Sequence, residues 1–123
     1  AHLSGYRDSA RACHPRKAIR IGELGAEANR DGPVGERGTT AFQRDFIAFH
    51  LGVYATKPWL SGAIYWALQE FRVRPNWDGG DPRPQPPIHQ KGLVTLDGVR
   101  KPAFADVQAA FRATQQIATT ARH

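Results

Sequence analysis

Residues 18–27 read AIRIGELGAE, an alternating apolar pattern that ends on a carboxylate followed at once by glycine. The period of two predicts a β-strand over 18–23. Ile19, Ile21 and Glu23 then share one face of that strand. Strand ends of this kind lie at the mouth of a sheet or barrel, where α/β enzymes carry their chemistry. Glu23 is therefore the first candidate for a catalytic residue.

A helix is predicted over 40–55, after a polar loop rich in glycine. Thr40 and Gln43 form a T-x-x-Q capping box at its start. The apolar side chains that follow recur at helical spacing and predict a helix packed on a sheet. They are Phe42, Phe46, Phe49 and Val53, with Ile47, Leu51 and Tyr54 widening the stripe.

A second strand is predicted over 60–68, where the chain is almost continuously apolar, as in a strand buried on both faces. The proline-rich segment 72–89 predicts a long irregular loop that shapes a surface. Pro102 at a first helical position predicts a last helix over 102–116. Its stripe is Phe104, Val107, Phe111 and Thr114.

The order strand, helix, strand, helix predicts the α/β class, with a parallel sheet covered by helices. Two strands alone leave bare edges and an uncovered face. A (β/α)₈ TIM barrel typically needs about 250 residues, whereas this chain has 123 residues and no methionine. We therefore expect this chain to be part of a larger domain of the barrel kind. Its partners would be the remainder of the barrel or, without it, a second copy of the chain.

The composition argues against several other partners. The net charge is +6, but 13 arginines and 4 lysines are scattered without a basic helix, so we expect no nucleic-acid partner. No apolar run approaches 18 residues, so no membrane-spanning helix is expected. The five histidines and the single Cys13 show no zinc spacing, and we expect neither a metal nor a cofactor.

Three motifs occur in order along the chain: IGELGAE at 21–27, GAIYWALQEF at 62–71, and HQKGLV at 89–94 followed by KPAF at 101–104. This order resembles the C-terminal quarter of the catalytic barrel of glycoside hydrolase family 2, the β-galactosidase, β-glucuronidase and β-mannosidase family. The resemblance covers roughly residues 16–112. It implies a C-terminal fragment, with about the last two βα units, of a (β/α)₈ TIM barrel. It also implies that the parent is a retaining β-glycosidase that acts on a carbohydrate by double displacement.

The resemblance also implies residue roles. Glu23 matches the nucleophile, one of two carboxyl groups that lie about 5 Å apart across the sugar in a retaining glycosidase. Trp66 matches the tryptophan that forms the floor of the sugar-binding subsite. His89 and Lys91 lie where glucuronidases carry N-x-K, which grips the substrate carboxylate, and both are candidate substrate-binding residues. Because His89 replaces the asparagine, a glucuronidase is not expected. The resemblance then leaves a β-galactosidase-like enzyme, a mannosidase-like enzyme or one of another specificity, and we take the β-galactosidase-like enzyme as the expectation.

Glu70 is expected to be a structural or rim acid rather than the second catalytic carboxylate. The family places its acid/base in an Asn-Glu pair, and this chain has no such dipeptide. The chain alone is therefore expected to be inactive. The alternative is a non-catalytic carbohydrate- or protein-binding module, with Trp66 and the proline-rich segment forming its surface.

Overall fold

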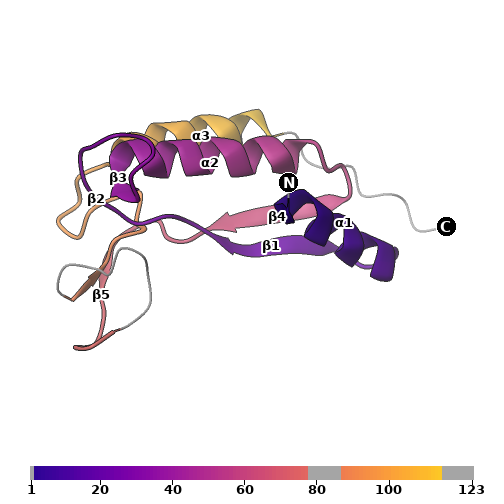
Figure 1. The fold of residues 1–123 in the computed structure, drawn as a ribbon, viewed down its shortest axis with the longest axis horizontal. Coiled ribbons are helices and arrows are strands. Elements are labelled where there is room, and N and C mark those ends of the chain that lie inside the picture. Colours follow the sequence, from indigo (N-terminus) through magenta and orange to yellow (C-terminus); the bar gives the residue numbers. More distant parts are fainter. Residues whose placement is uncertain (1, 78–86, 115–123) are drawn as a thin grey trace.

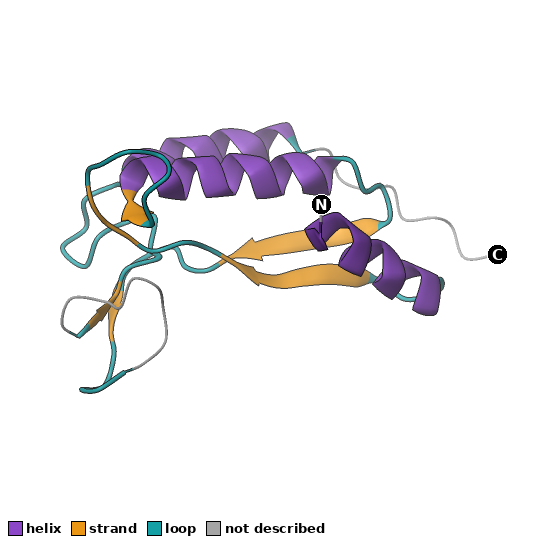
Figure 2. Ribbon diagram, in the orientation of Figure 1, coloured by secondary structure: helices purple, strands orange, loops and turns teal. Residues whose placement is uncertain are grey.

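The computed structural model describes residues 2–77 and 87–114, and its helices and strands are shown in Figures 1 and 2. In chain order they are α1 (His2–Cys13), β1 (Ile19–Leu24), β2 (Ala28–Arg30), β3 (Gly38–Thr39), α2 (Thr40–Ala55), β4 (Leu60–Tyr65), β5 (Phe71–Arg72), β6 (Ile88–His89) and α3 (Pro102–Ala113).

The centre of the fold is a parallel pair, β1 and β4, which pairs Ile19 with Leu60 and Leu24 with Tyr65. Helices α2 and α3 lie side by side over one face of this pair, and no described helix covers the opposite face (Figure 1). Both strands point toward the same end of the molecule, where the connecting loops gather. The predicted α/β class is therefore confirmed, in the form of a small two-layer unit.

Strand β4 is shorter and more exposed than the sequence predicts. It ends at Tyr65 rather than at residue 68, and Ile64 keeps 47% of its surface exposed. The expectation of a strand buried on both faces is wrong for the described chain, because α2 and α3 cover one side only. Leu60, which faces the helices, is buried together with Leu24 and Tyr54.

The predicted face of β1 also needs correction. Ile19 and Ile21 pack against the buried Leu24, whereas Glu23 is exposed. An irregularity in the pairing between Ile21 and Leu24 breaks the alternation. Such a bulge shifts the following side chains relative to the strand before it. Leu24 thus follows the isoleucines into the core, and Glu23 is left at the surface.

Helix α2 has the predicted bounds but a different cap and a rotated buried face. The hydroxyl of Thr39, not of Thr40, accepts the N–H of Phe42 at 3.0 Å, so the predicted capping box is wrong. Phe49 is 54% exposed. The buried residues of α2 are Gln43, Ile47, His50 and Tyr54.

Helix α3 packs beside α2, and the second core cluster lies between them. This cluster joins Ile47 and Leu93 to Ala103 and Val107. Helix α3 extends to Ala113, and the predicted end at residue 116 lies outside the described residues. Phe111 belongs to the predicted stripe but is 48% exposed. The buried residues of α3, Ala103 and Val107, lie in its first two turns.

The segment predicted to be irregular is closed at its base. Phe71 and Arg72 of β5 pair in antiparallel register with His89 and Ile88 of β6. Residues 78–86 lie outside the described part of the chain. Among the described helices, none combines the length and the apolar character that a bilayer crossing needs.

Candidate functional site

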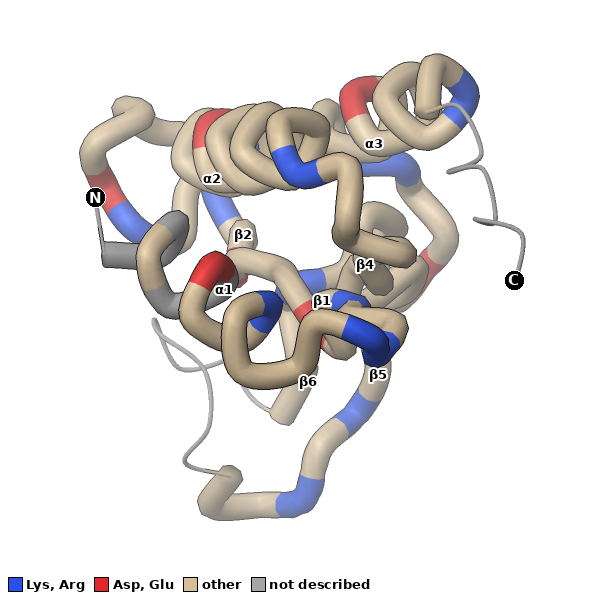
Figure 3. The backbone as a smooth tube through the Cα atoms, turned by 90° about the vertical axis from the view of Figure 1, so that its right-hand side faces the viewer, with Lys and Arg blue, Asp and Glu red and all other residues tan. Residues whose placement is uncertain are grey.

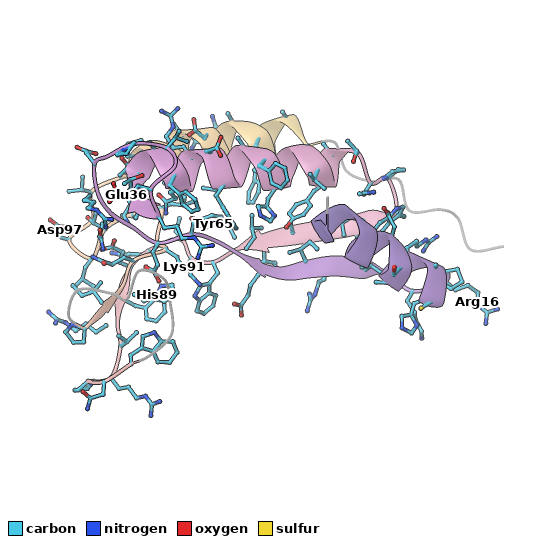
Figure 4. All side chains as sticks on the ribbon, viewed as in Figure 1. Arg16, Glu36, Tyr65, His89, Lys91 and Asp97 are labelled. Atoms are coloured by element: carbon cyan, nitrogen blue, oxygen red, sulfur yellow. The ribbon has the colours of Figure 1, made fainter. Side chains whose placement is uncertain are left out.

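Glu23, Trp66 and Lys91 line one open pocket of about 320 Å³. The pocket lies at the carboxyl ends of β1 and β4. Its helix side is formed by Phe46, His50 and Tyr54 of α2. Figure 4 shows the side chain of Lys91 beside Tyr65 beneath the N-terminal half of α2, with His89 further from the helix. Three residues singled out by the sequence therefore meet in space.

The ends of the two strands are held in contact by their backbones. The N–H of Trp66 donates to the carbonyl of Leu24 at 2.8 Å. A Cβ on Gly25 would collide with the carbonyl oxygen of Trp66. Glycine is thus needed where β1 ends, since any side chain there would push the strand carrying Glu23 away from Trp66.

A buried amide of α2 connects two loops beneath the pocket. The side-chain nitrogen of Gln43 donates to the carbonyl of Ala26 at 3.0 Å and lies 3.3 Å from the carbonyl of Lys91. The Tyr65 hydroxyl donates to the same Lys91 carbonyl at 2.9 Å. Burial raises the pKa of Tyr65, so the phenol stays protonated and remains a donor. This junction fixes the backbone of Lys91 relative to both strand ends.

A buried ion pair secures the loop on the far side of Lys91. The ammonium of Lys101 lies 2.6 Å from a carboxylate oxygen of Glu70, and both side chains are almost fully buried. The same ammonium donates to the carbonyls of Ala28 and Gln90 at 2.7 and 2.8 Å. The second oxygen of Glu70 accepts the N–H of Leu96 at 3.0 Å. Glu70 does not line the pocket, and its contacts are those of a structural acid.

Glu27 is a second buried acid, four residues beyond Glu23. One of its oxygens accepts the N–H of Gln90 at 2.8 Å, and the other has no hydrogen-bond partner among the described residues. Burial raises the pKa of this carboxyl, an effect that the Gln90 N–H and the charges of Lys91 and Lys101 partly oppose. Glu27 ties the loop after β1 to the segment that carries His89 and Lys91.

His89 lies behind Trp66 rather than in the pocket. Its Nε2 is 3.3 Å from the indole nitrogen of Trp66, and only 4% of the residue is exposed. Burial lowers the pKa of the imidazole, and the charge of Lys91 lowers it further. The structure therefore brings Glu23, Trp66 and Lys91 together at the pocket and places His89 as the neighbour of one of them.

The pocket combines an exposed carboxylate, a lysine and a partly exposed indole ring. A carboxylate can attack an electrophilic carbon, a lysine can bind an anionic or hydroxylated group, and an aromatic face packs on sugar C–H groups. The positive charges of the described chain are spread over several elements and do not gather into one patch (Figure 3). Within residues 2–77 and 87–114, no group of three potential metal ligands comes together.

Sequence reasoning missed the supporting residues Gln43, Tyr65, Lys101 and Glu27. Gln43 was assigned to the helix cap, although it lies four residues before Ile47 on the buried side of α2. A glutamine in line with apolar side chains was the available signal. Lys101 and Glu70 lie 31 positions apart, and no local pattern joins them.

Comparison with known proteins gives a likeness of structure only. No protein-family model matches the chain, and no curated protein sequence matches it. A GH2 β-galacturonidase from Eisenbergiella tayi, solved with galacturonate, is similar with a TM-score of 0.79 and 22% identity. The match covers 94% of this chain and 22% of that enzyme.

Two further solved structures show the same likeness. A Bifidobacterium dentium β-glucuronidase, in complex with coumarin-3-O-glucuronide, has a TM-score of 0.78 and 23% identity over 95% of this chain and 18% of that one. A β-D-glucuronidase of Dictyoglomus thermophilum has a TM-score of 0.77 and 18% identity, covering 94% and 19%. The chain thus has the fold of a segment of these glycosidases and spans about a fifth of their length. At the level of fold, the resemblance read from the three motifs is confirmed.

Proposed function

We propose that this chain is the C-terminal part of the catalytic (β/α)₈ barrel of a retaining β-glycosidase, with Glu23 as the nucleophile. The observation that carries the proposal is the shared pocket of Glu23, Trp66 and Lys91 at the carboxyl ends of two parallel strands. That end of a barrel is where enzymes with this fold hold their active sites. The glycosidase fold of the structural neighbours supports the same reading.

In the proposed reaction, the Glu23 carboxylate attacks the anomeric carbon while a second carboxyl group, outside this chain, protonates the leaving oxygen. Water then hydrolyses the glycosyl ester on Glu23 with net retention of configuration. Trp66 supports the sugar ring from one side. Glu70 takes no part, because it is buried and paired with Lys101.

For the sugar, we propose a β-hexuronide. Lys91 places a cation in the same pocket as Glu23, and the similar solved enzymes are a β-galacturonidase and β-glucuronidases. The second candidate is a neutral β-galactoside. One observation favours it. His89 is expected to bind a substrate carboxylate together with Lys91, but it lies behind Trp66 instead.

The remainder of the barrel is the proposed partner of the open edges of β1 and β4. An apolar groove of about 1310 Å³ between α2, β4 and α3 also stands open, lined by side chains such as Leu60, Ala63 and Phe111. Expressed alone, the chain is expected to cover these surfaces by self-association. Analytical ultracentrifugation of the isolated chain checks this, and an ordered monomer would contradict it.

Kinetics on aryl β-glycosides test the catalytic proposal in the intact protein that contains this chain. Glu23→Gln should lower kcat by roughly 10³-fold or more, as loss of a nucleophile does in other hydrolases that form a covalent intermediate. Glu36→Gln is the matched control, because Glu36 is an exposed acid paired with Arg30. Full activity in Glu23→Gln would overturn the proposal. A panel of β-glucuronide, β-galacturonide and β-galactoside decides the sugar.

The isolated chain should not turn over any of these substrates, because it lacks the general acid, a group that typically contributes 10²–10⁴-fold to the rate.

The non-catalytic alternative is a carbohydrate- or protein-binding module. The sequence upstream of this chain in the intact protein distinguishes it from the enzyme. An Asn-Glu pair about 80 to 120 residues before Glu23, as the length of barrel βα units implies, supports the enzyme. Absence of that pair favours the binding module.

A further inference from the structure

We propose that His89 is a positioning residue for Trp66, and that its neutral imidazole fixes the indole plane by accepting the indole N–H. The effect of His89 on catalysis rests on the proposed function, because Trp66 is the ring that would face the sugar. Its structural basis is the contact of 3.3 Å between His89 Nε2 and Trp66 Nε1.

The imidazole is held by a second aromatic ring. Phe71 stacks on His89 with a centroid distance of 4.6 Å and an interplanar angle of 11°. Trp66 meets both rings edge-on, at 85° to His89 and 83° to Phe71. Backbone pairing of β5 with β6 keeps Phe71 opposite His89. The three rings therefore form one unit, in which the plane of the imidazole cannot tilt without breaking the stack.

The direction of the hydrogen bond assigns the proton on the imidazole. An indole N–H is a donor only, so Nε2 must offer a lone pair and the proton must be on Nδ1. A doubly protonated imidazole has two donors and no acceptor. Protonation of His89 would set two donors against each other and release Trp66.

The charges around the imidazole come from several elements. Lys91 and Lys101 lower the pKa of His89, in addition to the larger effect of burial, and the charge of Glu23 raises it. The Nδ1 atom is buried without a hydrogen-bond partner among the described residues. A carboxylate oxygen of Glu27 lies 3.9 Å from Nε2, beyond hydrogen-bond distance. Arg72 is opposite Ile88 in the adjoining strand. Burial and the lysines prevail, so the neutral form that Trp66 needs is the form present at pH 7.

This arrangement gives the departure from N-x-K a physical meaning. The family resemblance implies that residue 89 binds a substrate carboxylate together with Lys91. In this chain it is 4% exposed and bonded to Trp66, and it does not line the pocket. His89 thus acts on the ring that contacts the sugar, and Lys91 alone is left to meet a charged group.

An NMR titration tests the hydrogen bond without any substrate. The intact protein is labelled with ¹⁵N-tryptophan, and the indole N–H resonance of Trp66 is assigned by its loss in Trp66→Phe. That resonance should titrate with a midpoint below pH 6.5, and the titration should vanish in His89→Gln, whose amide oxygen reaches the position of Nε2. An indole resonance that has the same chemical shift at pH 7 in His89→Phe as in the parent protein, or a titration that persists in His89→Gln, would overturn the inference.

Kinetics test the positioning role. His89→Phe keeps an aromatic ring on Phe71 but removes the acceptor, and should raise KM about fivefold with kcat little changed, the effect of one ordinary hydrogen bond. His89→Gln should restore KM, and His89→Phe should add nothing in a Trp66→Phe background. Additive effects would refute action through Trp66. His14→Gln, at an exposed histidine, is the control. If no glycoside is turned over, the proposed function fails, while the titration still decides the hydrogen bond.

Discussion

Lys101→Met removes the cation from a buried ion pair and leaves the Glu70 carboxylate without its partner. The two charged atoms lie 2.6 Å apart, with side-chain exposures of 6% and 7%. Loss of one partner of such a pair typically costs about 3–5 kcal/mol, because the remaining charge stays desolvated. The carbonyls of Ala28 and Gln90 lose a donor as well. Since small proteins are stable by about 5–15 kcal/mol, the variant should be close to unfolding.

The chain provides a matched control for this prediction. Arg44 and Asp106 also lie 2.6 Å apart, but their side chains are 54% and 35% exposed. Arg44→Met should therefore shift the unfolding midpoint little, because solvent screens an exposed pair. The two pairs have the same shortest distance and the same charges, and they differ in burial and in the two backbone carbonyls that Lys101 also serves.

Urea unfolding, followed by circular dichroism, measures both costs as changes in the midpoint at constant slope. The double variant Lys101→Met/Glu70→Gln should be more stable than Lys101→Met, because it contains no unpaired buried carboxylate. Equal costs for Lys101→Met and Arg44→Met would refute the reasoning. So would a double variant that is less stable than the single one.

Three further predictions concern the loops around the pocket. Gly25→Ala should destabilise the protein by about 1–3 kcal/mol in urea unfolding and raise KM, because the new Cβ meets the Trp66 carbonyl. Gly22→Ala is the control and should be neutral, because a Cβ there has no neighbour within 4 Å. Gln43→Leu should cost about 1–3 kcal/mol by leaving the carbonyls of Ala26 and Lys91 short of a donor; an unchanged urea midpoint would contradict the junction. Burial raises the pKa of Glu27 above 4.5, so its contribution to stability is complete below pH 4.5 and declines as pH rises through the higher folded value. Glu27→Gln should flatten that decline in urea titrations at several pH values, and an unchanged pH profile would contradict the assignment.

The predictable part of the fold is the part specified by local patterns. Helical spacing of apolar residues located α2 from Thr40 to Ala55, and Pro102 marked the start of α3. Alternation located β1 within one residue at each end. These signals depend on neighbours a few positions apart, which the sequence displays directly.

The remainder depends on contacts between distant positions. The bulge between Ile21 and Leu24 breaks the alternation that predicts Glu23 on the isoleucine face. No local pattern in residues 19–24 indicates this bulge. Gln43 is buried because Ala26 and Lys91 supply its acceptors from two other loops. His89 could be matched to a motif position, but its orientation toward Trp66 is set by stacking on Phe71. Roles assigned by motif therefore need the contacts before they can be read as mechanism.

Trapping the glycosyl intermediate is the most direct test of Glu23 as the nucleophile. In the intact protein, an activated β-glycoside with fluorine in place of the 2-hydroxyl slows hydrolysis of the ester more than its formation, so a covalent adduct accumulates. Peptide mass spectrometry should place one glycosyl group on the peptide containing Glu23, at that carboxylate. An adduct on another carboxylate, or steady turnover of the parent substrate with no adduct on Glu23, would contradict the account.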